Sequence, residues 1–406
     1  MKVAVINCGS SSIKYEVFDA RDFVMLATGL IEKIGSPDGR LRQRRLKADG
    51  TFDEQNYTKP LANHREAFDL MASVNQHDRI IKDDAEILGL GHRVVHGGET
   101  FREPALIDAE VIAAIRGLIP LAPLHNPSNL LGIEAAQERF PRVPQVAVFD
   151  TAFHHTLPPP AYRYAVPHEL YEKHHVRKYG FHGSSHAYVA KEASKHLGMP
   201  LSEVNLITLH LGNGASAAAV QEGRSIDTSL GMTPLEGLVM GTRCGDIDPS
   251  IPFYLMRQTV MKPDDVENIL NRESGLKGIC GVSDMREIQD RAAKGNERAE
   301  LAIEMFCYRI KKYIGAYHAV LGRLDAVVFT GGIGENSSEI RQRVCEGLKH
   351  LGIGVDSAKN NAAKGSVGEI QEAGLPVKVL VVRTNEEREI ALQTISTIEK
   401  TKVRSG

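Results

Sequence analysis

No long apolar run and no large excess of either charge occurs in this sequence of 406 residues, whose formal net charge is −2. Without an apolar run of about 20 residues, a membrane-spanning helix is not expected. The near-neutral charge gives no indication of a surface for nucleic acids or membranes. The first apolar segment is short and is interrupted by Asn7, so it does not fit a signal peptide. We therefore expect a cytoplasmic protein with neither nucleic-acid nor membrane partners.

Paired cysteines and the common metal and nucleotide motifs are also missing. The five cysteines are an odd number without any C-x-x-C spacing, which argues against a disulfide framework and a zinc knuckle. The 16 histidines include no H-E-x-x-H motif. The sequence G-x-x-x-x-G-K-[ST] does not occur either, which excludes a P-loop protein. We expect the cysteines to be reduced thiols.

The first eighteen residues predict a hairpin that binds phosphate. Two short apolar runs, rich in β-branched residues, flank the tight turn NCGSSS that begins at Asn7. Successive backbone N–H groups in such a turn can point into one concavity and hold an anion. Ser12 and Lys14 are two positions apart on the second strand and share a face, so the ammonium can reach that anion. The alternative is a polar turn without a ligand.

The same pattern returns near the middle of the chain. Residues 206–220, LITLHLGNGASAAAV, form an apolar strand, an Asn-Gly turn and a second strand of small residues, and Asn213 lies 206 positions after Asn7. The strand before Asp150 resembles the strand before Glu386, and GHRVVHGGE resembles VVFTGGIGE. These repeats predict two related α/β domains. Ligand groups at the carboxyl ends of their strands would face a shared cleft.

Periodicity and capping residues predict further elements. The motif HNPSNLL predicts a helix with Asn126 as N-cap and Pro127 at its first position. Ser184 or Ser185 is expected to cap the helix that ends at Gly198. Residues 227–250 predict a long ordered loop with a functional role. Other helices are expected at 63–72, 108–118, 297–324, 338–351 and 386–399, and other strands at 326–330 and 377–382.

Two glycine-rich turns are candidates for nucleotide binding. Residues 212–217, GNGASA, also fit the G-x-G-x-x-A pattern, which keeps an NAD-dependent dehydrogenase as a rival interpretation. A dinucleotide-binding turn must open a full helix, whereas only eight residues separate Gly214 from Gly223. A returning strand fits better. The second turn, at residues 331–336, allows close backbone approach to a ligand, or else tight packing of a strand on a helix.

Four charged residues lie in apolar or glycine-rich surroundings. Arg93 and Arg243 each need an anionic partner there, which could be a bound carboxylate or phosphate or a structural ion pair. Asp150 and Glu386 end strands in the two halves, and such carboxylates can hold magnesium opposite a triphosphate. For Glu386, helix capping is the alternative.

Eight motifs, in order over essentially the whole chain, resemble those of the acetate kinase family: NCGSSSIKY, HRVVHGG, VFDTAFH, KYGFHGSSH, HLGNGAS, DTSLGMTPLEGLVMGTRCGDIDP, FTGGIGENS and TNEER. The resemblance implies an α/β fold of duplicated actin-like ATPase (ribonuclease H-like) domains with a nucleotide cleft between them. We expect an N-terminal domain at 1–150, with the helix near 386–399 packing back on it. The C-terminal domain at 151–406 would carry the nucleotide site.

The resemblance also implies a reaction: reversible, direct in-line transfer of the γ-phosphoryl group of ATP to acetate, giving acetyl phosphate and ADP. Mg²⁺, with Mn²⁺ as a substitute, and a homodimer are implied with it. An ionised carboxylate is already a nucleophile, so this reaction needs charge neutralisation and positioning more than proton transfer. A propionate or butyrate kinase of the same family and an actin-like or chaperone ATPase are the alternatives.

Matching motifs imply the site residues. Asp150, His182 and Arg243 would be catalytic, and Asn7 and Glu386 would organise the metal. The acetate site would comprise Arg93, Val95, Leu124, His125, Phe181 and Pro234. ATP would be bound by Ser10, Ser12, Lys14, His210, Leu211, Gly212, Asn213, Gly214, Asp284, Met285, Arg286, Gly332, Ile333, Gly334, Glu335 and Asn336. Cys244, Cys280 and Tyr15 depart from the residues expected in the family, but none replaces a catalytic group.

Overall fold

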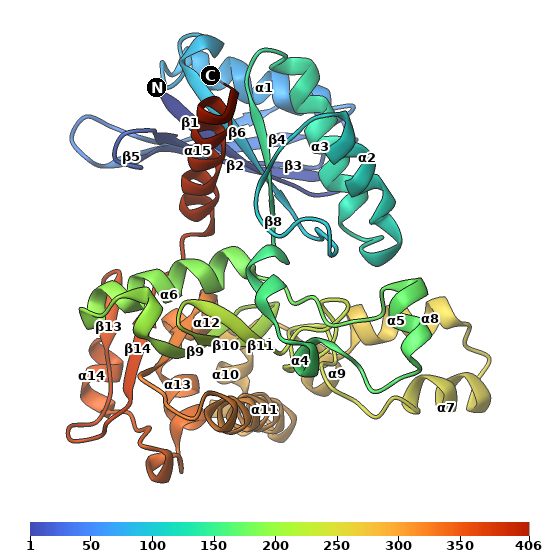
Figure 1. Ribbon diagram of the computed structural model, residues 1–406, viewed down its shortest axis with the longest axis vertical. Coiled ribbons are helices and arrows are strands. Elements are labelled where there is room, and N and C mark those ends of the chain that lie inside the picture. Colours follow the sequence, from blue (N-terminus) through green and yellow to red (C-terminus); the bar gives the residue numbers. More distant parts are fainter. Residues whose placement is uncertain (406) are drawn as a thin grey trace. The chain divides into compact units, whose positions relative to one another are not determined.

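The structure, a computed structural model, describes the backbone of residues 1–405 and the side chains of residues 1–403. The chain forms two compact units (Figure 1). The first unit contains Met1–Ala152 and the C-terminal segment from Asn385 onward, and the second contains Phe153–Thr384. The change from one unit to the other thus falls two residues after the expected boundary at residue 150. The C-terminal helix belongs to the first unit.

The first unit is built on an eight-stranded sheet with the order β5-β4-β3-β2-β1-β6-β8-β7. Strand β1 pairs antiparallel with β2 and parallel with β6, and β6 pairs parallel with β8. The strands are β1 (Lys2–Cys8), β2 (Ser12–Asp19), β3 (Met25–Glu32), β4 (Arg40–Leu46), β5 (Phe52–Thr58), β6 (Ile87–Val94), β7 (Ala105–Leu106) and β8 (Gln145–Phe149). Strands β4 and β5 pair as an antiparallel hairpin.

Helices cover both faces of this sheet. Their bounds are α1 (His64–His77), α2 (Ala109–Gly117), α3 (Asn126–Arg139) and α15 (Glu386–Ser405). Because successive side chains of a strand point to opposite faces, Ala4 and Ile6 pack in the cluster that includes α1 and α3. Val3 and Val5 pack against α15 on the other face. Residues 386–405 therefore contribute to the core of the first unit.

The second unit contains a six-stranded sheet with the order β11-β10-β9-β12-β14-β13. Its strands are β9 (Asn205–Leu211), β10 (Ala215–Gln221), β11 (Arg224–Thr228), β12 (Ala326–Thr330), β13 (Val367–Glu369) and β14 (Lys378–Val382). Helix α6 (Gly183–Leu197) packs on one face, and α11 (Glu297–Leu321) contacts β9 and β10. Strand β10 returns antiparallel to β9, as predicted, which is incompatible with the turn-to-helix geometry of a dinucleotide-binding fold.

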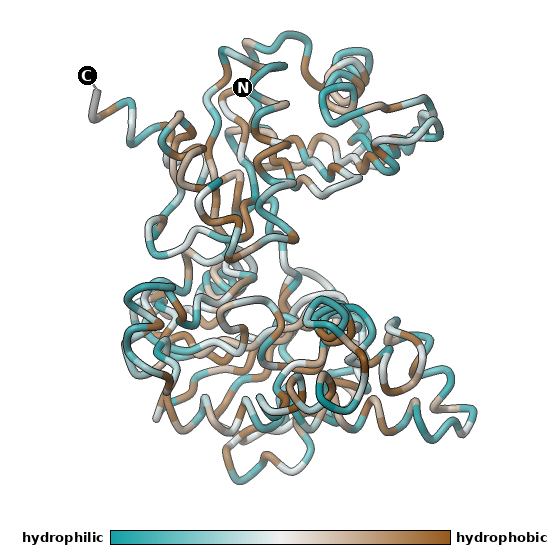
Figure 2. The backbone as a smooth tube through the Cα atoms, turned by 90° about the vertical axis from the view of Figure 1, so that its right-hand side faces the viewer, coloured by the Kyte–Doolittle hydropathy of each residue, from teal (hydrophilic) through white to brown (hydrophobic). Residues whose placement is uncertain are grey.

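Shorter helices complete the second unit. They are α4 (Pro159–Tyr162), α5 (His168–His174), α7 (Ile251–Gln258), α8 (Pro263–Asn268), α9 (Gly275–Cys280), α10 (Met285–Ala293), α12 (Gly331–Asn336), α13 (Ser338–Cys345) and α14 (Ser357–Ala362). In both units, 3-10 or π turns occur at Asp84–Glu86, Ile119–Leu121, Ala152–Thr156, Leu201–Glu203, Ile269–Glu273 and Lys349–Leu351. Apolar segments recur among the more polar stretches of each unit (Figure 2). Among the described residues, no helix combines the length and apolar character needed to cross a membrane.

The two sheets share one topology, so the predicted duplication is confirmed. The order β3-β2-β1-β6-β8 in the first unit matches β11-β10-β9-β12-β14 in the second, with the same strand directions. The expected pairing of Asn7 with Asn213 is wrong, however. Asn7 precedes the last residue of β1 and therefore corresponds to His210 of β9, whereas Asn213 lies in the turn that follows. The offset of 206 positions therefore relates a strand residue to a turn residue and is not the repeat of the two sheets.

Two predicted N-caps are wrong. Asn126 is the first residue of α3, not its cap, and its amide instead bonds the backbone of His96. Ser184 and Ser185 lie inside α6, whose N-cap is His182. In both cases a distant partner takes the polar side chain that the local pattern assigns to the helix terminus.

Other boundaries also differ from the predictions. Helix α11 ends at Leu321, three residues before the predicted end, and α15 extends six residues beyond 399. The glycine-rich segment at 331–336 is the short helix α12 and not a turn. The helix predicted at 338–351 ends at Cys345 and is followed by a 3-10 turn.

Candidate functional site

The turn between β1 and β2 is held from two directions in the first unit. The backbone N–H of Gly9 donates to the carbonyl of Ser12 over 2.8 Å, and Nε2 of His64 lies 2.9 Å from the carbonyl oxygen of Gly9. Ser10 is exposed at the tip of the turn, and Ser12 is half-buried. The backbone of the predicted phosphate turn is thus fixed before any ligand binds.

Lys14 follows this turn and is paired with carboxylates. Its ammonium contacts the Glu387 carboxylate and lies 3.6 Å from Oε1 of Glu16. Burial alone would lower the pKa of Lys14, but the neighbouring Glu387 and Glu16 raise it above its usual value. Lys14 therefore remains a cation, as the prediction of a phosphate contact requires.

Arg93 at the end of β6 forms an ion pair with Asp150, which follows β8. Its Nε lies 3.1 Å from both carboxylate oxygens, and its Nη2 lies 2.6 Å from Oδ2. The side chain of Asp150 is only 1% exposed. Asp150 and the other nearby carboxylates raise the pKa of Arg93. The sequence left two kinds of partner open for Arg93, a bound anion and a structural ion pair. The structure shows the ion pair, with Asp150.

Glu386 lies at the start of α15, close enough to interact with this pair. Burial raises its pKa to about 7, an effect that Arg93 opposes and that Asp150 and Glu387 reinforce. Burial therefore disfavours the carboxylate form of Glu386. A bound divalent cation would favour that form.

A magnesium ion fits the groups present here. Within residues 1–405, no cluster of three or more His, Cys, Asp or Glu side chains is arranged to hold a metal. Magnesium typically takes only one or two protein carboxylates and completes its shell with water and phosphate oxygens. Asn7 at the end of β1 and Glu386 offer hard oxygen donors of this kind.

Two asparagines that were not among the predicted site residues hold this part of the first unit together. The Asn129 amide donates to the carbonyl of Cys8 and accepts from the N–H of Val95, both over 3.1 Å. Asn126 bonds both backbone groups of His96, at 3.2 and 3.1 Å. Both amides are buried. Their bonds join the carboxyl ends of β1 and β6, which carry Asn7 and Arg93.

In the second unit, His182 adopts an unusual backbone conformation. Its φ is 57°, in the left-handed region that a non-glycine residue rarely occupies. Nδ1 lies 2.8 Å from Oγ of Ser216 in β10, and the ring lies against that of His210, with 4.4 Å between centroids. Strained conformations of this kind cluster at functional sites.

Arg243 and His182 converge on Gly214 in the β9–β10 turn. A Cβ atom placed on Gly214 would lie 2.6 Å from Nη2 of Arg243 and 3.4 Å from Nε2 of His182. Nη1 of Arg243 donates to the carbonyl of Pro234 over 2.6 Å. Burial lowers the pKa of Arg243, and no carboxylate of the described chain forms an ion pair with it. A desolvated guanidinium without a counter-charge is suited to bind an anion.

Several of the remaining residues predicted to bind ATP already form hydrogen bonds or ion pairs within the protein. Oε1 of Glu335 accepts from the N–H groups of Gly331 and Thr384, both at 3.0 Å, so this carboxylate joins α12 to the end of β14. A Cβ on Gly332 would meet nothing within 4 Å. Asp284 caps α10 and pairs with Arg286 over 2.5 Å. The role of these segments in ATP binding remains a prediction.

The residues expected around acetate belong to both units. Val95, Leu124 and His125 are in the first unit, and Phe181 and Pro234 are in the second. Leu124 is 51% exposed, whereas Phe181 is buried and its carbonyl accepts from Nε2 of His154 over 3.0 Å. Their assignment to one acetate site stays a prediction.

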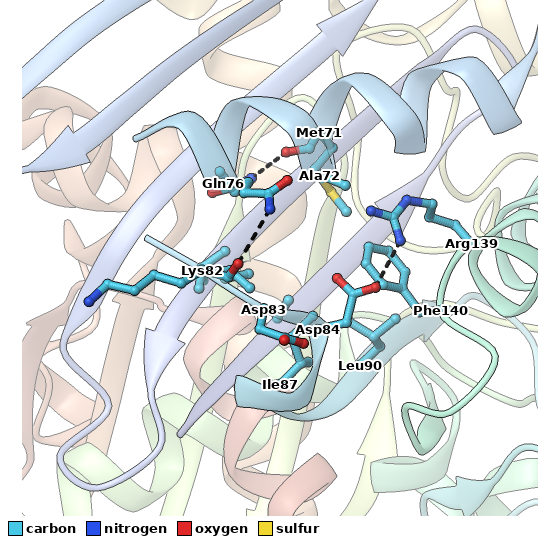
Figure 3. A pocket seen from close by; sticks show the side chains of 14 residues that line it. Met71, Ala72, Gln76, Lys82, Asp83, Asp84, Ile87, Leu90, Arg139 and Phe140 are labelled. Carbon is cyan, nitrogen blue, oxygen red and sulfur yellow. Dashed lines mark hydrogen bonds and ion pairs between the residues drawn. The ribbon is translucent and has the colours of Figure 1, made fainter. Parts of the chain in front are cut away.

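A cavity of about 260 Å³ in the first unit lies outside this set of residues. Figure 3 shows its lining between α1 and the residues Arg139 and Phe140, with Asp83 and Asp84 at one side. A second cavity, of about 640 Å³, is lined by residues of α4 and β10–β11 in the second unit. Neither contains a predicted site residue.

The duplicated topology is that of the actin-like ATPase fold, and an uncompensated guanidinium beside a histidine at a glycine turn is suited to phosphoryl transfer. A family model described as the acetokinase family matches residues 2–392. The chain belongs to this family.

Relatives support the assignment over the whole length. The chain is 57% identical to an acetate kinase of Syntrophobacter fumaroxidans, with 100% of this chain and 99% of that protein covered. The crystal structure of Porphyromonas gingivalis acetate kinase superposes with a TM-score of 0.92 at 45% identity, covering 98% of this chain and 99% of the other. A propionate kinase from Francisella tularensis gives a TM-score of 0.90 at 42% identity, covering 97% and 99%.

Proposed function

We propose that this protein transfers the γ-phosphoryl group of ATP reversibly to acetate, giving acetyl phosphate and ADP. The family match over residues 2–392 carries this proposal. The convergence of Arg243 and His182 on Gly214 supports it chemically, because in-line transfer to a carboxylate depends on positioning and on stabilising the charge of the transferring group.

Arg93 binds the acetate carboxylate in this mechanism. Its bonds to Asp150 use Nε and Nη2, which leaves Nη1 to donate to the substrate. Asp150 holds the guanidinium plane in place and balances its charge. Acetate therefore meets a fixed donor and not a mobile cation, which favours an in-line approach to phosphorus.

Arg243 and His182 act on the phosphoryl group. Negative charge spreads over its three equatorial oxygens as the bond to ADP breaks. Arg243 forms no ion pair within the described chain that must break before it contacts these oxygens. Its stabilisation of the transferring phosphoryl group is therefore preorganised. His182 donates from Nε2 beside it. The turns that carry Ser10, Ser12 and Lys14, and Gly212 to Gly214, bind the phosphate chain.

Asn7 and Glu386 hold magnesium, with manganese as a substitute. The ion neutralises charge on the nucleotide phosphates when it is bound.

We also propose a cytoplasmic location, which the five free thiols support. A homodimer is proposed as well. The exposed apolar side chains of Leu301, Met305 and Tyr308 along α11 support it, and light scattering at two concentrations tests it.

Trapping acetyl phosphate as the hydroxamate tests the proposed activity. Purified protein with ATP, magnesium and acetate should give the coloured hydroxamate, and it should give less with propionate and much less with butyrate. Each added methylene changes discrimination by about 1–3 kcal/mol in a pocket of fixed size. ATP hydrolysis without hydroxamate would refute the proposal, and equal specificity constants for acetate and butyrate would refute the assignment of the acid.

A further inference from the structure

A buried hydroxyl connects His182 to a second histidine in the second unit. Oγ of Ser216 in β10 lies 2.8 Å from Nδ1 of His182 and 2.8 Å from Nε2 of His186 in α6. The other ring nitrogen of His186 lies 2.7 Å from Oγ1 of Thr208 in β9. Ser216, His186 and Thr208 are all 0% exposed. The four side chains form one chain of contacts that leads from the site into the core.

His186 is neutral in this chain. Burial, and then the neighbouring His154 and His210, hold its pKa well below the ordinary range of histidine. A neutral imidazole has one N–H donor and one acceptor nitrogen. His186 therefore donates to only one of its two hydroxyl neighbours and accepts from the other.

The hydroxyl of Ser216 has the same restriction. It has one hydrogen to donate and accepts through its lone pairs. Placed between Nδ1 of His182 and Nε2 of His186, it can donate to only one of them. Choosing the direction of one hydrogen bond therefore fixes the direction of the others along the chain.

An anionic oxygen held by Arg243 at Gly214 would decide that direction. Nε2 of His182 and Nη2 of Arg243 face the same point at Gly214, so a second positive charge on His182 would be repelled by the guanidinium. A neutral His182 can donate to an anionic oxygen at this point only if its proton is on Nε2. Its Nδ1 must then accept from Ser216, Ser216 must accept from Nε2 of His186, and Nδ1 of His186 must accept from Thr208. The reverse direction would turn a lone pair of His182 toward the anion.

We propose that Ser216 and His186 are positioning residues that hold His182 as the tautomer protonated at Nε2. The part played by this N–H in phosphoryl transfer rests on the proposed function. The direction of the hydrogen bonds rests on it too, because an anionic oxygen at Gly214 sets that direction.

Nitrogen NMR of the protein labelled with ¹⁵N-histidine tests the tautomer directly. The His182 signals are identified by their loss in His182→Gln. We expect a protonated Nε2 and a bare Nδ1 at neutral pH in the wild-type protein saturated with inorganic phosphate. A bare Nε2, or protons on both nitrogens, would overturn the inference whether or not the protein phosphorylates acetate. In Ser216→Ala the His182 signals should move toward a mixture of the two tautomers.

Kinetics then test what this orientation contributes. Ser216→Ala should lower kcat about 10- to 100-fold, the range typical for losing a partner that orients a metal-binding histidine, with the KM for acetate within threefold. His186→Gln keeps an N–H donor for Ser216 and should stay within about threefold of wild type. His186→Phe removes the donor and should resemble Ser216→Ala.

The matched control is Ser194→Ala. Ser194 is also buried and lies in α6, but its hydroxyl bonds only the carbonyl of Met199 in the contacts seen here. Equal kcat values for Ser216→Ala and Ser194→Ala, or equal losses in His186→Gln and His186→Phe, would overturn the positioning role. If the wild-type protein forms no acyl phosphate at all, the proposed function fails and the NMR result still decides the tautomer.

Discussion

Replacing Gly214 by alanine places one methyl group at the point where Arg243 and His182 converge. The new Cβ would lie 2.6 Å from Nη2 of Arg243, whereas ordinary contacts begin near 3.4 Å. Arg243 must therefore withdraw by roughly 3.4 − 2.6 = 0.8 Å. Gly214 does not have a left-handed backbone, so the substitution adds no backbone strain. Its effect should be confined to the site.

A displacement of about 1 Å in a catalytic group can reduce the rate about 100-fold, equivalent to about 2.7 kcal/mol of transition-state stabilisation. We expect Gly214→Ala to lower kcat by about this factor and to leave Tm nearly unchanged. The assay is steady-state formation of acetyl hydroxamate, with thermal unfolding followed by circular dichroism.

Gly315→Ala is the control for this experiment. It lies in α11 with nothing within 4 Å of its Cβ position, so it should keep full activity. It should also gain up to about 1 kcal/mol of stability from helix propensity. If Gly214→Ala retains kcat within threefold of wild type, the convergence of Arg243 and His182 has no catalytic role.

Further variants examine the charges and the packing. Arg243→Ala should lower kcat by about 10³-fold or more without lowering Tm, whereas Arg93→Ala should raise the KM for acetate. Arg93→Ala should also destabilise the fold by about 3–5 kcal/mol, because Asp150 loses its partner at 1% exposure. Indistinguishable kinetic and thermal profiles of the two variants would contradict this division. Burial lowers the pKa of His92 to about 4, below the unfolded value near 6.5, so its contribution to stability is present above pH 6.5 and is lost as the pH falls toward 4. Between pH 7 and 4.5, the free energy of unfolding measured in urea should therefore fall by about 2 kcal/mol less in His92→Gln than in the wild-type protein. Equal decreases in the two proteins would refute this. Gly91→Ala would bring its Cβ to 2.2 Å from Oγ1 of Thr394 in α15 and should cost about 1–3 kcal/mol of unfolding free energy. Gly117→Ala, with nothing within 4 Å, should change stability by less than about 1 kcal/mol, and equal effects of the two would argue against close packing of α15.

The sheets were predictable where local pattern decides structure. The short apolar run around Val3 and the small residues after Gly214 predicted the hairpins β1–β2 and β9–β10, because short runs of this kind bounded by turn residues are typical of strands. Their repetition predicted the duplicated topology. The repeat offset was wrong because Asn7 lies within β1 whereas Asn213 lies in the turn after β9, a difference that composition alone does not reveal.

Caps and charge partners required contacts that are distant in sequence. Asn126 has the composition of an N-cap, but His96, 30 residues away, takes its amide. Ser185 bonds His210, 25 residues away, instead of capping α6. Arg93 and Arg243 look alike in the sequence, and only the fold brings Asp150, 57 residues away, to Arg93 while leaving Arg243 without a carboxylate. Such differences depend on tertiary contacts and cannot be obtained from local propensity.

Phosphorus NMR of a single reaction mixture tests the central claim most directly. With purified protein, magnesium, ATP and acetate, we predict that acetyl phosphate and ADP appear together in equal amounts and that adding ADP to the equilibrated mixture regenerates ATP. Inorganic phosphate appearing with ADP, in place of acetyl phosphate, would contradict the account.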